Sequence, residues 1–228
     1  KFFEKIREFL ANPEVKVIIT DFEIAAIKAC SLLFPSSTNG GCYFHFRHCM
    51  RRQLQTGGQQ ARYDGDRDFQ SFVKTIMAIA FVPVEHVFKA FEIVCATADI
   101  PEEAQSIITY FENTWVGRRM PRKDPKFKHI LWNFFDSIIE HYPNTNNFVE
   151  AWHRTLHNQF HAKKPSIWKF LEGLLREQSL TEFKTNQSNA GNQEPQRKKY
   201  KDKNKRLQVI VSRFREEYEE TDDFVICL

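Results

Sequence analysis

The first 46 residues show apolar patterns that alternate between helical and extended spacing. Over residues 2–10 the apolar positions recur at helical spacing, and the β-branched run Val15–Thr20 then predicts a short buried strand. A second helix is predicted over Ile24–Leu32, a turn over Ser36–Gly41 and an aromatic strand over Cys42–Phe46. The order helix, strand, helix, strand favours a parallel sheet covered by helices, in which ligands bind at the carboxyl ends of the strands.

The pattern changes after this alternating segment. From about residue 47 to residue 145 the apolar positions repeat with a period near 3.6, which is typical of helices. Apolar stripes that begin at Phe69, Val84 and Ala104 predict three of these helices. A further helix is predicted over Phe127–His141. We therefore expect a block made only of helices inside an α/β fold.

The last third of the chain is predicted to be helical with one interruption. The turn segment Pro143–Asn147 precedes a helix over 148–161, and Pro165 opens another that continues to about Phe183. The predicted organisation is a core over residues 1–46, a helical insertion over 47–145, closing core helices over 146–183, a polar and basic linker over 184–206, and a C-terminal helix and tail over 207–228.

Composition narrows the class of protein. With 228 residues, 42% of them hydrophobic, the chain can close one large domain or a core with a subdomain. The longest apolar run, Ile76–Val84, is too short for a bilayer span, so we expect no membrane protein. The five cysteines are irregularly spaced, which favours a reducing compartment, the cytosol or the nucleus. A chain that starts at Lys1 suggests a piece of a longer polypeptide.

Positive charge is concentrated in two segments, although the net charge is only +4. Residues 197–206 contain seven basic side chains, and this run is typical of a solvated linker, with a phosphate-contacting or nuclear-import segment as the alternative. The second segment contains Arg118, Arg119, Arg122 and Lys123. It is typical of the solvated face of a loop, with a docking surface as the alternative.

Two carboxylates occupy positions at which metal chemistry is common. Asp21 directly follows the predicted strand Val15–Thr20, where metals and phosphates bind in α/β sheets, although it would also suit the cap of the next helix. Glu150 lies in the first turns of the helix after the PNTNN segment, where a glutamate also interacts favourably with the helix dipole.

Polar side chains continue along the helix that carries Glu150. His153, Arg154, His157 and His161 follow Glu150 at three- and four-residue steps, which place them on the same face of the helix. This polar stripe is predicted to line a water-filled cleft or to contact an anionic ligand. The Glu-x-x-His spacing is also found in di-iron sites. Those sites need a second such helix, and the sequence has no other Glu-x-x-His.

The segment CYFHFRHC gathers side chains that can bind soft metals. It contains Cys42, His45, His48 and Cys49. Structural zinc sites generally take four ligands, often in two pairs that are well separated in sequence. Here the first pair falls in a predicted strand and no distant pair is evident, so the pattern does not favour zinc. A buried strand cysteine with a histidine facing a cleft is the preferred interpretation.

The chain resembles the transposase domain of Mutator-like elements (the MULE family) over about residues 1–183. The resemblance rests on five segments in the family's order: ITDFEIAAIKACSLLFP, GCYFHFRHCMRR, DFQSFVKTIMAIAFVP, YFENTWVG and PNTNNFVEAWHRTLHNQF. It implies a DDE-type recombinase with a ribonuclease H-like core interrupted by a helical subdomain. The activity implied is metal-dependent DNA cleavage and strand transfer at transposon ends, in the nucleus, by a protein that self-associates.

The resemblance also implies roles for particular residues. Asp21 would be the family's second catalytic aspartate and Glu150 its closing glutamate, both of them metal ligands. Cys42 and His45 match the family's Cys-x-x-His motif, which is expected near that site. Trp115 matches an aromatic position of the insertion, where related transposases suggest contact with an unstacked base. His153 and Arg154 would position phosphate or ligands.

One part of the family pattern is missing. The family's first aspartate lies on an earlier strand, and the first three strands of the ribonuclease H-like sheet do not occur in this sequence. A site with two Mg²⁺ or Mn²⁺ ions is expected only with that aspartate, so the chain alone should cut DNA poorly. The alternatives are a domesticated or decayed relative that binds DNA or protein without catalysis, and a helical scaffold whose acidic residues only cap helices.

Overall fold

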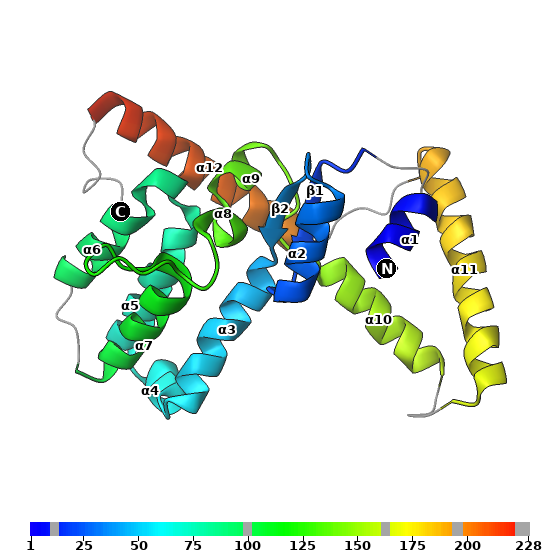
Figure 1. The fold of residues 1–228 in the computed structure, drawn as a ribbon, viewed down its shortest axis with the longest axis horizontal. Helices are drawn as coiled ribbons and strands as arrows, with labels where there is room; N and C mark the ends of the chain where they lie inside the picture. The colour runs from blue at the N-terminus through cyan, green and yellow to red at the C-terminus, as the bar shows by residue number, and fades with distance from the viewer. Residues whose placement is uncertain (10–13, 98–101, 161–164, 193–197, 222–228) are drawn as a thin grey trace. The chain divides into compact units, whose positions relative to one another are not determined.

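The computed structural model describes residues 1–9, 14–97, 102–160, 165–192 and 198–221 (Figure 1). These residues are mostly helical and include one sheet of two parallel strands, which is compatible with an α/β class carrying a helical insertion. The chain divides into two compact units, the first formed by residues 1–145 with 206–228 and the second by residues 146–205. Within the described ranges, no helix is both long and apolar enough to cross a membrane.

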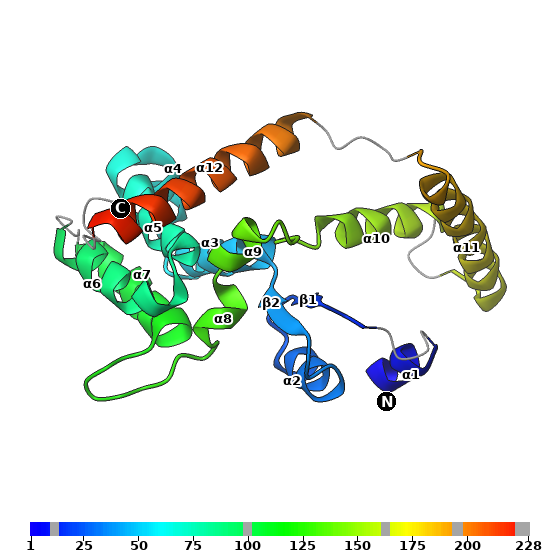
Figure 2. The same cartoon turned by 90° about the horizontal axis from the view of Figure 1, so that it is seen from above.

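The elements of the first unit alternate only at the beginning. In chain order they are α1 (Phe2–Phe9), β1 (Val17–Thr20), α2 (Ile24–Leu33), β2 (Thr38–Gly41), α3 (Tyr43–Thr56), α4 (Gln60–Gly65), α5 (Arg67–Ala78), η1 (Ile79–Phe81), η2 (Val84–His86), α6 (Val87–Thr97), η3 (Glu102–Ala104), α7 (Gln105–Phe111), η4 (Glu112–Val116), α8 (His129–Trp132) and α9 (Phe135–Ile139). Figures 1 and 2 show α5, α6 and α7 grouped at one end of this unit and the two strands at the other.

The second unit contains two helices and the start of a third. These are α10 (Asn147–Gln159), α11 (Ile167–Asn189) and α12 (Lys198–Thr221), and α12 continues into the first unit. The linker predicted over 184–206 is therefore wrong in part, because α11 runs on to Asn189 and α12 begins within the basic run at Lys198. The predicted helix 148–161 is α10, and His161 lies outside the described residues.

The predicted strand–helix–strand unit is present, but its second strand was predicted at the wrong residues. β1 and α2 lie where the apolar pattern placed them, and β1 pairs in parallel with β2. The second strand, however, is the segment Thr38–Gly41, which was predicted to be a turn. A strand of this composition forms because its backbone bonds to β1, and such tertiary pairing overrides the low β propensity of glycine and asparagine.

The predicted aromatic strand Cys42–Phe46 is instead the beginning of helix α3. The buried residues of this helix are Phe46, Met50 and Leu54, at four-residue steps that fit a helical period. Over five residues alone, the aromatic side chains favour a strand, and the helical period becomes visible only when the following two turns are included. Cys42 is the N-cap residue of α3, with extended backbone angles.

One hydrophobic core joins the strand end to the predicted insertion. The buried cluster includes Phe22, which follows β1, Phe46 of α3, and Trp115 and Trp132 of the helical block. The Phe46 ring stacks on the Trp132 ring at 5.6 Å between centroids. Residues 47–145 therefore share their core with Phe22, the residue that lies two positions after the end of β1.

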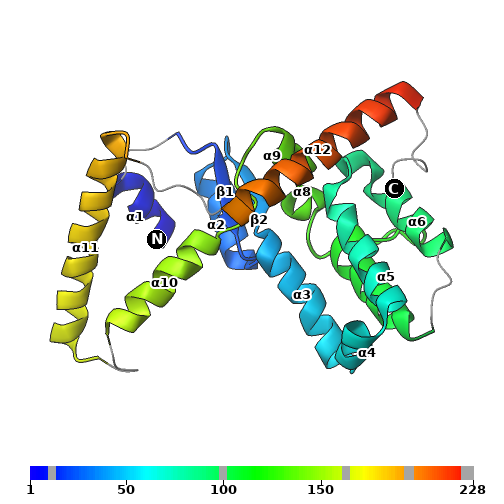
Figure 3. The same cartoon turned by 180° about the vertical axis from the view of Figure 1, so that it is seen from behind.

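The predicted helix 127–141 is two short helices, α8 and α9, separated at Asn133. The Asn133 side chain replaces the missing helical bonds: its oxygen accepts from the Phe135 N–H at 3.0 Å and its nitrogen donates to the Val82 carbonyl at 2.6 Å. Further along the chain, Val211 and Phe214 of α12 are buried in the same core. Figure 3 shows α12 passing α9, and the Phe214 ring lies 6.2 Å from the Phe135 ring of α9.

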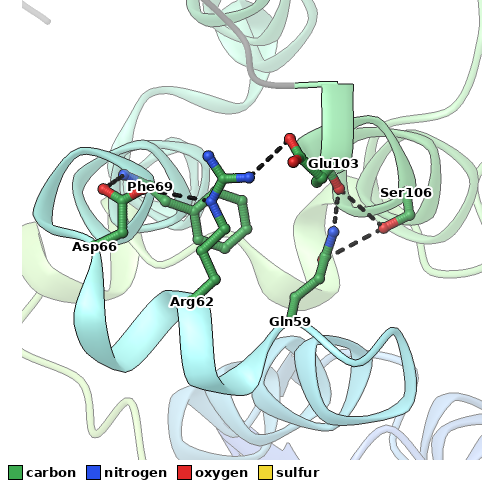
Figure 4. A network of polar contacts seen from close by, with 6 residues as sticks. All are labelled: Gln59, Arg62, Asp66, Phe69, Glu103 and Ser106. Carbon is green, nitrogen blue, oxygen red and sulfur yellow. Dashed lines mark hydrogen bonds and ion pairs between the residues drawn. The ribbon is translucent and has the colours of Figure 1, made fainter.

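A polar network fastens α4 and α5 to η3 and α7 (Figure 4). The Arg62 guanidinium bonds to the Glu103 carboxylate at 2.7 Å and lies over the Phe69 ring at 5.1 Å from its centroid. The buried Gln59 side chain donates to the Glu103 carbonyl. Asp66 is the N-cap of α5, and its Oδ1 accepts from the N–H groups of Asp68 at 2.9 Å and Phe69 at 3.1 Å.

Replacing Asp66 with alanine is expected to lower the melting temperature, because two N–H groups of the first turn of α5 lose their acceptor. The Asp66→Asn variant keeps a side-chain oxygen and is the matched control. The Phe69 N–H bond holds the pKa of the Asp66 carboxyl below its usual value. This contribution is present above the unfolded-state pKa and is lost as pH falls through the folded value. Thermal melts should therefore show the alanine effect shrinking below about pH 4.

Candidate functional site

Asp21 lies at the carboxyl end of β1, directly after Thr20. The N-cap position of the following helix is occupied by Glu23, and the Asp21 side chain is half exposed, at 51%. The next residue, Phe22, has a φ of 63°, a left-handed conformation that costs a bulky residue about 1–3 kcal/mol. A strained residue beside an exposed carboxylate is a common feature of functional sites.

The sheet register brings Cys42 and His45 to the same place. Thr20 pairs with Gly41 in the parallel ladder, so the residues that follow the two strands, Asp21 and Cys42, come out at the same edge. The Cys42 N–H donates to the Thr20 carbonyl at 2.8 Å. Because Cys42 caps α3 and His45 is three residues further, both side chains lie on one face of the first helical turn.

These three side chains form a compact cluster. One ligand atom of each, the Asp21 oxygen, the Cys42 sulfur and a His45 nitrogen, lies within 4.8 Å of the other two. The Nδ1 atom of His45 is 3.2 Å from Oδ1 of Asp21. Cys42 is fully buried, His45 is one quarter exposed and Asp21 is half exposed, so the cluster opens to solvent on the carboxylate side.

Phe22 and Gly41 lie next to the cluster and connect it to the aromatic core. The Phe22 ring packs edge-on against Trp115 at 5.0 Å and against Phe127 at 5.2 Å between centroids. Gly41 leaves room for this ring, because a Cβ atom at position 41 would overlap it and would come within 2.7 Å of the Leu131 carbonyl. The aromatic core therefore holds Asp21 through its neighbour, and neither Phe22 nor Gly41 was identified from the sequence.

Trp115 has a supporting position and no accessible face. It is fully buried, and the rings of Phe22, Phe46, Phe127 and Trp132 lie within 6.0 Å of it. Stacking on an unstacked base needs an exposed ring face, which Trp115 does not have in this structure, so the predicted base contact stays a prediction. Trp115 instead packs on the residue that follows Asp21.

The basic loop is mostly exposed, as expected for a solvated face, and it also lines a cavity. The cavity has a volume of about 780 Å³. Its basic lining residues are Arg118, Arg119, Arg122, Lys123, Lys126 and Lys128, accompanied by one acidic residue, Asp124. The Arg119 guanidinium lies 4.9 Å from the centroid of the Phe88 ring, at the wall of the cavity. Lys126 and Lys128 flank Phe127, whose ring contacts Phe22.

The remaining predicted residues belong to the second unit. Glu150, His153 and Arg154 are all on α10, with Glu150 partly buried and the other two exposed. In this unit Glu177 of α11 accepts from the Trp152 ring nitrogen at 2.6 Å and from the Gln159 amide at 2.9 Å. A helix turns about 100° per residue, so the face with Glu150, His153 and Arg154 is opposite to the face that meets α11.

The site thus unites Asp21, Cys42 and His45, which were predicted separately, with a support of Phe22, Gly41 and Trp115. Its donor set is one carboxylate, one thiol and one imidazole. The parallel register of β1 with β2 would have shown that these residues lie together. It could not be inferred because the second strand was predicted at Cys42–Phe46 instead of Thr38–Gly41. Comparisons of the chain with family models, with curated proteins and with solved structures returned no match.

Proposed function

We propose that this chain is part of the catalytic domain of a DDE-type transposase with a ribonuclease H-like core, which cuts and joins DNA. The observation that carries the proposal is the position of Asp21, at the carboxyl end of a parallel strand and in contact with the Cys-x-x-His segment. The order of motifs that resembles Mutator-like transposases adds support. The nuclear location and self-association of such proteins are part of the same proposal.

The reaction needs hard divalent cations, and the described cluster fits them only in part. Mg²⁺ takes oxygen ligands, and Asp21 supplies the one carboxylate of the cluster. Glu150 and a further carboxylate would complete the set. When bound, the ions would activate the attacking hydroxyl and stabilise the leaving oxygen. His45, in contact with Asp21 at 3.2 Å, would hold the carboxylate in position.

The basic cavity suits the DNA backbone. Six cationic side chains line it, of which Arg118 is paired with Glu112 and Arg122 with Asp124, so a net positive charge remains. Phosphate contacts of this kind are independent of sequence and weaken with salt. The cavity adjoins Phe127, which packs against the neighbour of Asp21.

The short stretch of chain between Asn144 and Glu150 is compatible with the proposed role of Glu150 as a metal ligand. The Tyr43 N–H, in the first turn of α3, donates to the Asn144 carbonyl at 2.9 Å, so the segment before α10 is anchored beside Cys42. Six residues separate Asn144 from Glu150, and at ~3.5 Å per residue the chain restricts their separation to about 21 Å. Within the second unit, Glu150 lies on the face of α10 that is turned away from α11.

Nicking of a supercoiled plasmid tests the proposal. The plasmid would carry the terminal repeats of a Mutator-like element, and the protein would be expressed together with any coding sequence that lies upstream of it. Nicking is expected in Mg²⁺ or Mn²⁺ and not in EDTA, and Asp21→Asn and Glu150→Gln should each abolish it. Asp68→Asn and Glu172→Gln remove equivalent exposed carboxylates and should leave the rate unchanged.

Two outcomes would overturn the catalytic assignment. Nicking that is unaffected by Asp21→Asn and Glu150→Gln would show that neither carboxylate takes part. Absence of nicking, together with salt-dependent binding of the plasmid ends in a fluorescence anisotropy assay, would favour the alternative of a DNA-binding module without catalysis. Circular dichroism of each variant establishes that it is folded.

A further inference from the structure

We propose that Asp21, Cys42 and His45 bind a zinc-type transition-metal ion. The three donors come from two places in the chain that the parallel register brings together, the end of β1 and the first turn of α3. The inference uses residues of the first unit only. It does not depend on Glu150 or on transposase activity. Asp21 has two carboxylate oxygens, so Oδ1, which faces His45, can bind this ion while the other oxygen is left for the Mg²⁺ of the proposed function.

The donor chemistry selects the class of metal. A thiol and an imidazole are ligands for zinc and related transition metals, whereas magnesium takes oxygen ligands. The sequence pattern did not favour zinc because Cys42 and His45 were placed in a strand. With Cys42 as the helix cap and His45 three residues later, both point to the same side, and Asp21 is the third ligand that the sequence pattern did not provide.

The distances are close to those that zinc requires. With bonds of about 2.0–2.3 Å and tetrahedral angles, ligand atoms on one zinc ion are ~3.3–3.7 Å apart. The contact between His45 Nδ1 and Asp21 Oδ1, at 3.2 Å, already has this separation. All three atoms lie within 4.8 Å of one another, so the Cys42 sulfur needs to move by no more than about 1.5 Å to reach this separation.

The surroundings fit a site with an open coordination position. The sulfur is enclosed by the core, which protects a metal thiolate from solvent, and Asp21 faces water. Three protein ligands with a fourth position open to solvent are typical of zinc sites that bind a water or a substrate, whereas purely structural sites are closed by four protein ligands. The geometry therefore points to an ion that can exchange its fourth ligand.

Cobalt substitution tests this site directly. Titration of the purified chain with Co²⁺ is expected to saturate near one ion per chain and to produce the near-ultraviolet absorption of a cobalt–thiolate bond. Zn²⁺ should displace the cobalt, and a chromophoric chelator gives its affinity. Cys42→Ser, His45→Gln and Asp21→Asn should each weaken Zn²⁺ binding by about tenfold or more, and Cys42→Ser should also remove the thiolate band.

The same helix supplies the matched controls. Cys49→Ser and His48→Gln change the same residue types further along α3, where burial raises the pKa of the Cys49 thiol, and both should leave the cobalt spectrum unchanged. Saturation without a thiolate band, or a band that is lost in Cys49→Ser and kept in Cys42→Ser, would overturn the proposal. Glu150→Gln should bind Co²⁺ normally, so a failure of DNA nicking and a failure of this site give different results.

Discussion

Replacing Trp115 with alanine is expected to lower the free energy of unfolding of the first unit by about 3–5 kcal/mol. The side chain is fully buried among four aromatic rings, and its backbone carbonyl accepts from the Trp132 ring nitrogen at 2.9 Å. Truncation removes a large apolar surface and leaves a cavity that the four rings, which belong to separate parts of the fold, cannot fill. Urea denaturation followed by circular dichroism at 222 nm would measure the loss.

Trp168→Ala is the matched control for this experiment. That tryptophan is 78% exposed on α11, in the second unit, so its truncation should change the free energy of unfolding by no more than about 0.5 kcal/mol. Equal midpoints for the two variants would contradict a core role of Trp115. If Trp115 contacted a DNA base instead, its loss would weaken DNA binding while leaving the midpoint unchanged.

Replacing Gly41 with alanine is expected to destabilise the protein by about 1–3 kcal/mol and to weaken metal binding at the Asp21 cluster. The added methyl group would overlap the Phe22 ring on one side and approach the Leu131 carbonyl on the other, at 2.7 Å. Phe22 has a strained backbone and directly follows Asp21. Moving its ring therefore shifts the carboxylate away from Cys42 and His45.

Gly40→Ala provides a control one residue away. A Cβ atom at position 40 would meet nothing within 4 Å, so this variant should be neutral or stabilising by about 0.4–1 kcal/mol. Thermal melts and the cobalt titration would be carried out on both variants. A Gly41→Ala protein with the wild-type melting temperature and cobalt spectrum would show that the Phe22 ring can relax without moving the cluster.

The sequence predicted those parts of the fold that are determined by local periodicity. The strand Val17–Thr20 and helix α2 were found because β-branched and helical patterns are complete within their own segments. Strand β2 was missed because it is stabilised by pairing with β1, and its glycines carry no strand preference. The break at Asn133 was missed for a similar reason, because its side chain bonds to a carbonyl 51 residues away.

The candidate site was predicted in pieces. Asp21, Cys42 and His45 were each identified by residue type and spacing, but their convergence depends on the register of β1 with β2. The left-handed Phe22 and the close approach at Gly41 are set by tertiary packing, which a single sequence does not display. The roles of Glu150, His153 and Arg154 stay predictions, because these residues belong to the other unit.

The close fit between Gly41 and Phe22 restricts how this chain can diverge. A related protein with a larger residue at position 41 would need a smaller side chain at position 22, together with a larger one at 115 or 127 to refill the core. Single changes at any of these positions should destabilise the protein, while compensating paired changes should be tolerated better. Once several related chains are compared, covariation among these four positions should mark the support of the cluster, even where Asp21 itself never varies.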